Sequence, residues 1–167
     1  PDVEWEPVDT EDSMAIQDAL HILLTANGYG TVLGTKIGCT TKVMQDYLGV
    51  PHPCAGGIFD TTVQHGIGKF GFNSFLHVGV ECEIAVKLKS AISASGAPHT
   101  IGSVSEAVGA FFPAIEIVDD RYVDFSVREP DWRIWLADDF FGAGIVLGNP
   151  VFNWHALDLS RVQGSLM

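Results

Sequence analysis

The chain has 167 residues, 47% of them hydrophobic and 18% charged, which is enough for one domain with a substantial core. Its net charge of −12 argues against nucleic acid and anionic membrane surfaces as partners, because both repel an acidic protein. Every long apolar run is broken by charge or glycine and the first residues are acidic, so neither a transmembrane helix nor a signal peptide is expected.

The first half of the chain predicts two helices with a strand between them. Residues 11–27 predict a helix, because their apolar side chains share one helical face. A capping residue precedes this segment and a glycine follows it. Residues 31–38 predict a short strand, and residues 41–48 predict a second helix that a glycine closes. Residues 54–75 are rich in glycine and are expected to form a loop, apart from the short apolar piece at 57–59.

The second half predicts three strands and one further helix. Residues 76–89 and 113–119 have the apolar character of strands. Between them, residues 103–112 predict a helix that opens with the capping box Ser-Val-Ser-Glu. Residues 120–143 are expected to be irregular, and residues 144–148 predict a buried strand.

No internal repeat, low-complexity tract or linker divides the chain. Residues 1–167 are therefore expected to form a single catalytic domain of mixed α and β structure. The chain begins at Pro1 without an initiator methionine, and residues 157–167 alternate as in a strand up to the last residue. We expect the domain to be incomplete, with parts of the protein lying outside this sequence at both ends.

Two predicted strands carry glutamates where this residue is unfavourable. Glu81 and Glu83 point to the same face of their strand, and Glu116 lies inside an apolar run. Three carboxylates gathered at one place repel each other unless a cation joins them, and Mg²⁺ prefers such oxygen ligands. The alternatives are a solvated edge face for the pair, and an ion pair of Glu116 with Arg121 or Lys36.

Lys36 and Asp60 are candidates for acid, base or electrostatic roles. Lys36 lies at a glycine-flanked strand end, where it could neutralise a substrate carboxylate or an enolate, or simply be solvated. Asp60 follows a loop and could be a general base or an ordinary turn residue. The six histidines show no metal-binding spacing and are expected to be incidental. The three dispersed cysteines indicate a reduced, cytoplasmic compartment and no cysteine-based metal site.

Several motifs, taken in order, resemble the 2-keto-4-pentenoate hydratase family, a branch of the fumarylacetoacetate hydrolase superfamily. The pieces that carry the resemblance are AIQ at 15–17, GTKIGCTTKVMQ at 34–45, GIFD at 57–60, VECEIA at 80–85, PAIEIVDDR at 113–121 and ADD at 137–139. The resemblance covers about residues 10 to 167. The family usually has Asn where this chain has Asp139, and small polar residues where it has Phe140 and Phe141.

The resemblance implies an α+β fold in which a mixed β-sheet forms a roll of the fumarylacetoacetase C-terminal-domain type, with flanking helices. The strand-rich part that completes this roll in the family is absent from the sequence. The resemblance also implies a homo-oligomer. It assigns roles to seven side chains: Glu81, Glu83 and Glu116 as ligands of Mg²⁺ or Mn²⁺, Lys36 and Asp60 as catalytic groups, and Thr40 and Gln45 as substrate contacts.

The function that the resemblance implies is a metal-dependent lyase of aromatic-compound catabolism. It would add water to 2-hydroxypenta-2,4-dienoate-type acids, with small 2-oxo or 2-hydroxydienoic acids as its substrates. One alternative is a decarboxylase of 2-oxo-3-enedioates such as 4-oxalocrotonate, which would need a further cation, with Arg121, Arg128 and Arg133 as candidates. Another is a non-catalytic binding or structural domain that keeps the fold.

Overall fold

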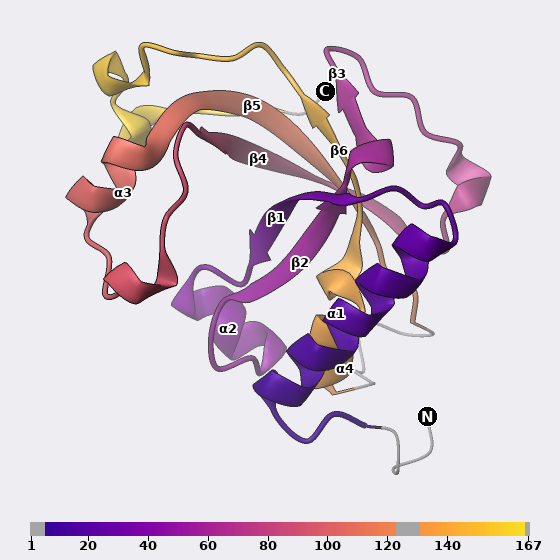
Figure 1. Ribbon diagram of the computed structural model, residues 1–167. Coiled ribbons are helices and arrows are strands. Elements are labelled where there is room, and N and C mark those ends of the chain that lie inside the picture. The colour runs from indigo at the N-terminus through magenta and orange to yellow at the C-terminus, as the bar shows by residue number, and fades with distance from the viewer. Residues whose placement is uncertain (1–5, 123–130, 166–167) are drawn as a thin grey trace.

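The structure is a computed structural model that describes residues 6–122 and 131–165 (Figure 1). It is an α+β fold with one two-stranded sheet and one mixed four-stranded sheet, as expected. The helices in these ranges are α1 (Thr10–Ala26), α2 (Lys42–Leu48), α3 (Ile101–Ala107) and α4 (Trp132–Ala137). The strands are β1 (Val32–Gly38), β2 (Cys54–Phe59), β3 (Val63–His65), β4 (Val78–Leu88), β5 (Val108–Asp119) and β6 (Gly142–Leu147). No helix in the described ranges is long and apolar enough to cross a membrane.

The strand register sets the positions of the charged residues. β1 pairs antiparallel with β2, which places Lys36 opposite Gly56. The larger sheet has the order β3-β6-β5-β4, with β3 parallel to β6 and the other pairs antiparallel. β4 pairs along its length with the long, curved β5, and Glu81 stands directly opposite Glu116 (Figure 1).

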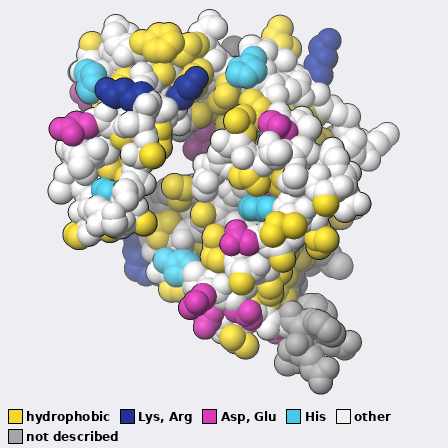
Figure 2. Space-filling view, in the orientation of Figure 1, with side chains coloured by type: hydrophobic (Ala, Val, Ile, Leu, Met, Phe, Trp, Pro, Cys, Tyr) yellow, Lys and Arg dark blue, Asp and Glu magenta, His cyan; other side chains and the backbone are white. Residues whose placement is uncertain are grey.

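β4 is an edge strand of this sheet, and β5 is its one strand partner among the described residues. Its apolar residues Val80, Ile84, Val86 and Leu88 are all between 45% and 51% exposed. Hydrophobic side chains are also visible over much of the surface in Figure 2. The apolar side chains of this edge strand are therefore only partly covered.

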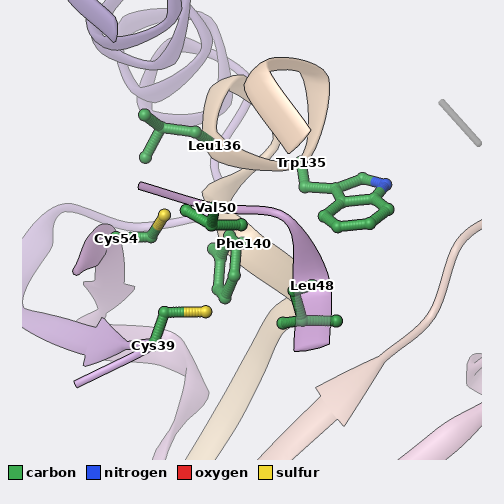
Figure 3. Packing of buried hydrophobic residues seen from close by; sticks show 7 residues of the cluster. All are labelled: Cys39, Leu48, Val50, Cys54, Trp135, Leu136 and Phe140. Carbon is green, nitrogen blue, oxygen red and sulfur yellow. The ribbon is translucent and has the colours of Figure 1, made fainter. Parts of the chain in front are cut away.

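The largest buried cluster lies between α4, the β1–β2 pair and the turn before β6 (Figure 3). Its members are Cys39, Leu48, Val50, Cys54, Trp135, Leu136 and Phe140. Helix α1 is attached nearby through Gln17, which is 3% exposed and donates to the carbonyl oxygens of Ala55 and Leu136 at 2.9 and 2.6 Å. A buried amide with both donors satisfied fixes α1 against β2 and α4.

Most predicted elements are confirmed, but two segments expected to lack regular structure are not. The predicted loop at 54–75 contains β2 and β3, and the predicted irregular segment at 120–143 contains α4. Glycine is typical of loops, but Gly56 lies against the carbonyl oxygen of Asp139 and Gly57 lies against the ring of His21, so neither marks a turn. Helix α4 has only six residues, too few for a helical period to stand out.

The remaining corrections concern boundaries. The predicted helix at 103–112 begins earlier and ends at Ala107, because Thr100 is its cap and β5 starts at Val108. The capping box is formed by Thr100 with Ser103, one turn before the motif that predicted it. The strand expected at 157–167 is also wrong within the described residues, since Leu159–Arg161 forms a 3-10 turn.

The three thiols should differ sharply in reactivity. Cys39 and Cys54 are 8% and 1% exposed, whereas Cys82 is exposed. Burial raises the pKa of the Cys54 thiol to about 12, with a smaller contribution from the neighbouring Cys39. Burial also raises the pKa of the Cys39 thiol. We expect a disulfide reagent such as DTNB near neutral pH to titrate one thiol in the native protein and three after denaturation. The variant Cys82→Ser should show no rapidly reacting thiol. Rapid modification of more than one thiol in the native protein would contradict the burial of Cys39 and Cys54.

Candidate active site

Three glutamates from two neighbouring strands converge at one place. Glu81 and Glu116 face each other across β4 and β5, and Glu83 follows two residues later on the same face of β4. One carboxylate oxygen from each of the three lies within 4.8 Å of the others. Glu81 and Glu83 are exposed and Glu116 is partly buried, so the cluster opens toward solvent on one side.

The donor set fits a hard divalent cation. Oxygens bound to one Mg²⁺ at its usual distance lie at most about 4.2 Å apart, so only a small contraction of the cluster is needed. The set contains no sulfur or imidazole, which favours Mg²⁺ or Mn²⁺ over zinc. A non-catalytic domain would also leave Glu81 and Glu83 exposed. That alternative gives no reason for Glu116 to converge with them.

Lys36 is the cation that the structure places against this cluster. Its Nζ lies 3.0 Å from Oε1 of Glu116, and the two side chains are only 10% and 13% exposed. Nζ also donates to the backbone carbonyl of Phe140 and lies 5.4 Å from the centroid of that ring. Of the two ion-pair partners considered for Glu116, the structure therefore selects Lys36 over Arg121. One ammonium cannot neutralise three carboxylates, so negative charge remains in excess at the cluster.

The electrostatics of Glu83 reflect this excess of negative charge. Partial burial raises the pKa of the Glu83 carboxyl, and repulsion from Glu116 and Glu81 adds to the increase. Lys36 acts in the opposite direction but is outweighed. A divalent ion at the cluster would reverse the shift, because it favours the ionised carboxylate.

The cluster borders a cavity of about 1210 Å³ between β1, β4 and β6. Its walls are mainly apolar, which suits the carbon chain of a small organic acid. The charged and hydroxyl side chains that line it are those of Tyr29, Thr35, Lys36, Thr40, Thr62, Glu83, Lys87, Glu116, Arg121, Asp138 and Asp139.

Three residues assigned by resemblance have different positions relative to this cavity. Thr40 lines it, as a substrate contact should. Gln45 lies outside the lining and donates to the carbonyl of Cys39 at 2.9 Å, where it stabilises the turn between β1 and α2. Asp60 is exposed and outside the lining, and it accepts hydrogen bonds from the backbone and hydroxyl of Thr31 at 3.1 and 3.0 Å. Those two bonds lower the pKa of the Asp60 carboxyl.

An imidazole–carboxylate pair is present that sequence reasoning missed. Nε2 of His21 lies 2.6 Å from Oδ1 of Asp139, and their side chains are 15% and 9% exposed. The same Oδ1 accepts a hydrogen bond from the backbone N–H of Gly57 at 2.8 Å. The two residues are 118 positions apart, so no local spacing could reveal them. The available signal was Asp139 itself, at a position where the resembled family usually has Asn.

Arg121 lines the cavity but is already engaged. Its Nε donates to Oδ2 of Asp138 at 2.8 Å, and its terminal nitrogens donate to the carbonyls of Asp138 and Gly142 at 2.6 and 3.2 Å. The hydroxyl of Tyr122 also donates to Asp138, at 3.2 Å. Arg133, by contrast, lies at the surface against Asp131, and Arg128 is outside the described residues. The arginine nearest the pocket therefore has its charge largely offset.

The turn between α4 and β6 has an unusual backbone. The φ angles of Asp139, Phe140 and Phe141 are 58°, 46° and 66°. Residues other than glycine seldom adopt this region. The turn can pack against β2 because residue 56 is glycine. A Cβ on Gly56 would lie 2.5 Å from the carbonyl oxygen of Asp139. This backbone path delivers the Phe140 carbonyl to Lys36, which is a typical use of local strain at a functional site.

Known proteins similar to this chain include hydratases and decarboxylases. No protein-family model matches the chain. A 2-keto-4-pentenoate hydratase of Burkholderia vietnamiensis is 33% identical over 153 residues, covering 91% of this chain and 56% of that protein. A 4-oxalocrotonate decarboxylase of Pseudomonas putida is 29% identical over 136 residues, covering 81% of this chain and 49% of that protein.

Among solved structures, the chain is similar to 4-oxalocrotonate decarboxylase from Pseudomonas putida G7, complexed with magnesium and adipate. The TM-score is 0.79 at 23% sequence identity, over 89% of this chain and 54% of that chain. This match confirms the expected fold, and the curated relatives confirm the resemblance stated from the motifs. The chain spans about half the length of the curated relatives that it matches.

Proposed function

We propose, from the relationship of this chain to the 2-keto-4-pentenoate hydratase and 4-oxalocrotonate decarboxylase family, that the protein is a metal-dependent lyase. The proposed reaction is the addition of water to 2-hydroxypenta-2,4-dienoate-type acids. The observation that carries the proposal is the convergence of Glu81, Glu83 and Glu116 beside Lys36 at the edge of a cavity. The activity, substrate and oligomeric state of the whole protein are parts of this proposal.

The three glutamates would hold the metal ion, Mg²⁺ or Mn²⁺. When bound, such an ion supplies Lewis-acid stabilisation of a substrate carboxylate and its adjacent 2-oxygen. The carboxylates keep that position because they lie on paired strands, where backbone hydrogen bonds fix their spacing. The open side of the cluster leaves room for substrate oxygens next to the glutamates.

Lys36 stabilises negative charge that develops on the substrate. Glu116 and the Phe140 carbonyl occupy two of the three N–H donors of its ammonium, and no other described residue is recorded as taking the third. A preorganised cation in a largely buried position is effective at stabilising an enolate oxygen. In this proposal Asp60 acts through water, because its carboxylate is bound to Thr31 outside the cavity lining.

The state of Arg121 favours hydration of a monoacid over decarboxylation of an enedioate. A second substrate carboxylate would need a cation beyond Lys36, and Arg121 is offset by Asp138. Asp139 adds further negative charge to the lining. The observation that favours the decarboxylase is Lys87, which lines the same cavity farther along β4 and has no ion-pair partner among the described residues.

A paired assay on the full-length protein tests the proposal. One arm follows the loss of dienoate ultraviolet absorbance, and the other follows CO₂ release from 4-oxalocrotonate, each with Mg²⁺, Mn²⁺ or EDTA. We expect metal-dependent dienoate loss that exceeds CO₂ release and is unaffected by Lys87→Gln. If CO₂ release dominates and Lys87→Gln removes it, the decarboxylase is correct. If neither occurs and millimolar Mg²⁺ leaves the melting temperature unchanged, the domain is non-catalytic.

A further inference from the structure

We propose that Asp139 is a proton-transfer group of this pocket and that His21 is its positioning residue. This inference rests on the proposed lyase function and extends it to two residues to which the resemblance assigns no role. It starts from the lining of the cavity, which Asp139 shares with Lys36 and Glu116. A proton-transfer group must reach the substrate, and Asp60 does not share that lining.

The two oxygens of Asp139 have different environments. Oδ1 is held from two sides, by the ring of His21 at 2.6 Å and the N–H of Gly57 at 2.8 Å. Among the described residues Oδ2 has no hydrogen-bond partner, and these residues contain no fully buried side-chain oxygen that lacks one. Oδ2 is therefore accessible, and because Asp139 is otherwise enclosed and borders the cavity, we place that access on the cavity side.

His21 fixes the orientation of this carboxylate. It projects from α1, and its ring meets the ring of Phe59 edge-on, with centroids 5.4 Å apart and planes at 87°. A Cβ on Gly57 would lie 2.7 Å from two atoms of the imidazole, so the ring fits only because that residue is glycine. An imidazole packed on two sides and bonded to Oδ1 leaves Oδ2 pointing in one direction.

The proposed step is ketonisation of the bound dienol. The carboxylate of Asp139 accepts the proton of the 2-hydroxyl group while the oxygen electron pair forms the carbonyl and the diene electrons shift toward C5. The carboxylic acid then returns the same proton to C5, which forms a C–H bond and restores the carboxylate. The step needs no oxidant or co-reactant, and the imidazole of His21 stabilises the carboxylate before and after it.

Asp139→Asn is the informative substitution, because it removes proton transfer by Asp139 but keeps the hydrogen bonds that hold the turn. Its amide oxygen can still accept from Gly57 and from His21, so the turn keeps its hydrogen bonds. It cannot accept and return a proton. Asp46→Asn is the matched control, since it makes the same chemical change in an exposed aspartate on α2 outside the cavity lining.

The test uses the full-length protein with Mg²⁺ and 2-hydroxypenta-2,4-dienoate. We expect Asp139→Asn to lower kcat at least about 100-fold with KM within about threefold, and Asp46→Asn to leave kcat within about twofold of the wild-type value. Formate should restore part of the activity of Asp139→Ala, which a purely structural role would not allow. His21→Gln should give an intermediate loss. In metal-free protein, the downfield imidazole N–H resonance of His21 should move upfield in Asp139→Asn.

The outcomes that contradict this inference alone differ from the one that also contradicts the proposed function. If the wild-type protein consumes the dienoate and Asp139→Asn retains more than about a third of its kcat, the inference is wrong and the proposed function stands. If Asp60→Asn shows the large loss in place of Asp139→Asn, the inference is also wrong. If the wild-type protein consumes no substrate although Mg²⁺ raises its melting temperature, the proposed function fails and this inference fails with it.

Discussion

Replacement of Glu116 by Gln is expected to abolish both metal binding and turnover. The substitution keeps the size of the side chain but removes one of three carboxylates that converge within 4.8 Å. The loss of Mg²⁺ affinity should exceed the roughly 10–100-fold that removal of an outer-shell partner costs, because a direct ligand is lost. Isothermal titration with Mg²⁺ measures the affinity, and loss of dienoate absorbance measures turnover.

The metal-free form of the Glu116→Gln variant should remain folded. Its melting temperature is expected to change little, since relief of repulsion with Glu81 and Glu83 offsets the lost ion pair with Lys36. Glu106→Gln is a suitable control, because Glu106 is an exposed glutamate on α3 away from the cluster. A Glu116→Gln protein with intact Mg²⁺-dependent activity would refute the metal assignment.

Replacement of Lys36 by Met should separate catalysis from metal binding. Methionine keeps an unbranched stem but removes the cation, so kcat should fall about 10²- to 10³-fold, the range seen when one preorganised charge-stabilising donor is lost. The Mg²⁺-induced rise in melting temperature should be retained. It should even be larger than in the wild-type protein, because the variant leaves Glu116 without its ammonium partner until an ion binds.

The control for this prediction is Lys42→Met. Lys42 pairs with Asp46 four residues later on α2, but both side chains are more than 60% exposed. Exposed pairs of this kind contribute little, so activity and stability should stay close to those of the wild-type protein. Equal loss of activity in the two lysine variants, or an unchanged kcat in Lys36→Met, would contradict the role given to Lys36.

The parts of the fold that follow a simple period could be predicted from sequence. The alternation along β4 correctly places Glu81 and Glu83 on one face, and the helix expected at 11–27 lies within one residue of the bounds of α1. The register that sets Glu116 opposite Glu81 is a long-range property of the sheet. Local sequence gives the face of a side chain but not the residue across from it.

The parts that escaped prediction depend on contacts between distant segments. β2 carries Gly56 and Gly57 because the carbonyl of Asp139 and the ring of His21, respectively, lie where a Cβ would be, so a loop-like composition marks a crowded strand. Likewise, His21 gains significance only through Asp139, and nothing within either local sequence connects them. The ion pair of Lys36 with Glu116 was one of two partners considered, and only the three-dimensional arrangement distinguishes it from Arg121.

The carbonyl that holds Lys36 belongs to the main chain, and this has a consequence for mutational surveys. Any amino acid at position 140 still presents a carbonyl oxygen, so alanine scanning there reports the loss of a buried ring and not of a lysine ligand. The sensitive position is Gly56, where one added methyl group would displace the Asp139 carbonyl and shift the turn. A survey interpreted only through side-chain chemistry would identify Gly56 as important. It would miss the hydrogen bond between Lys36 and the Phe140 carbonyl that this glycine protects.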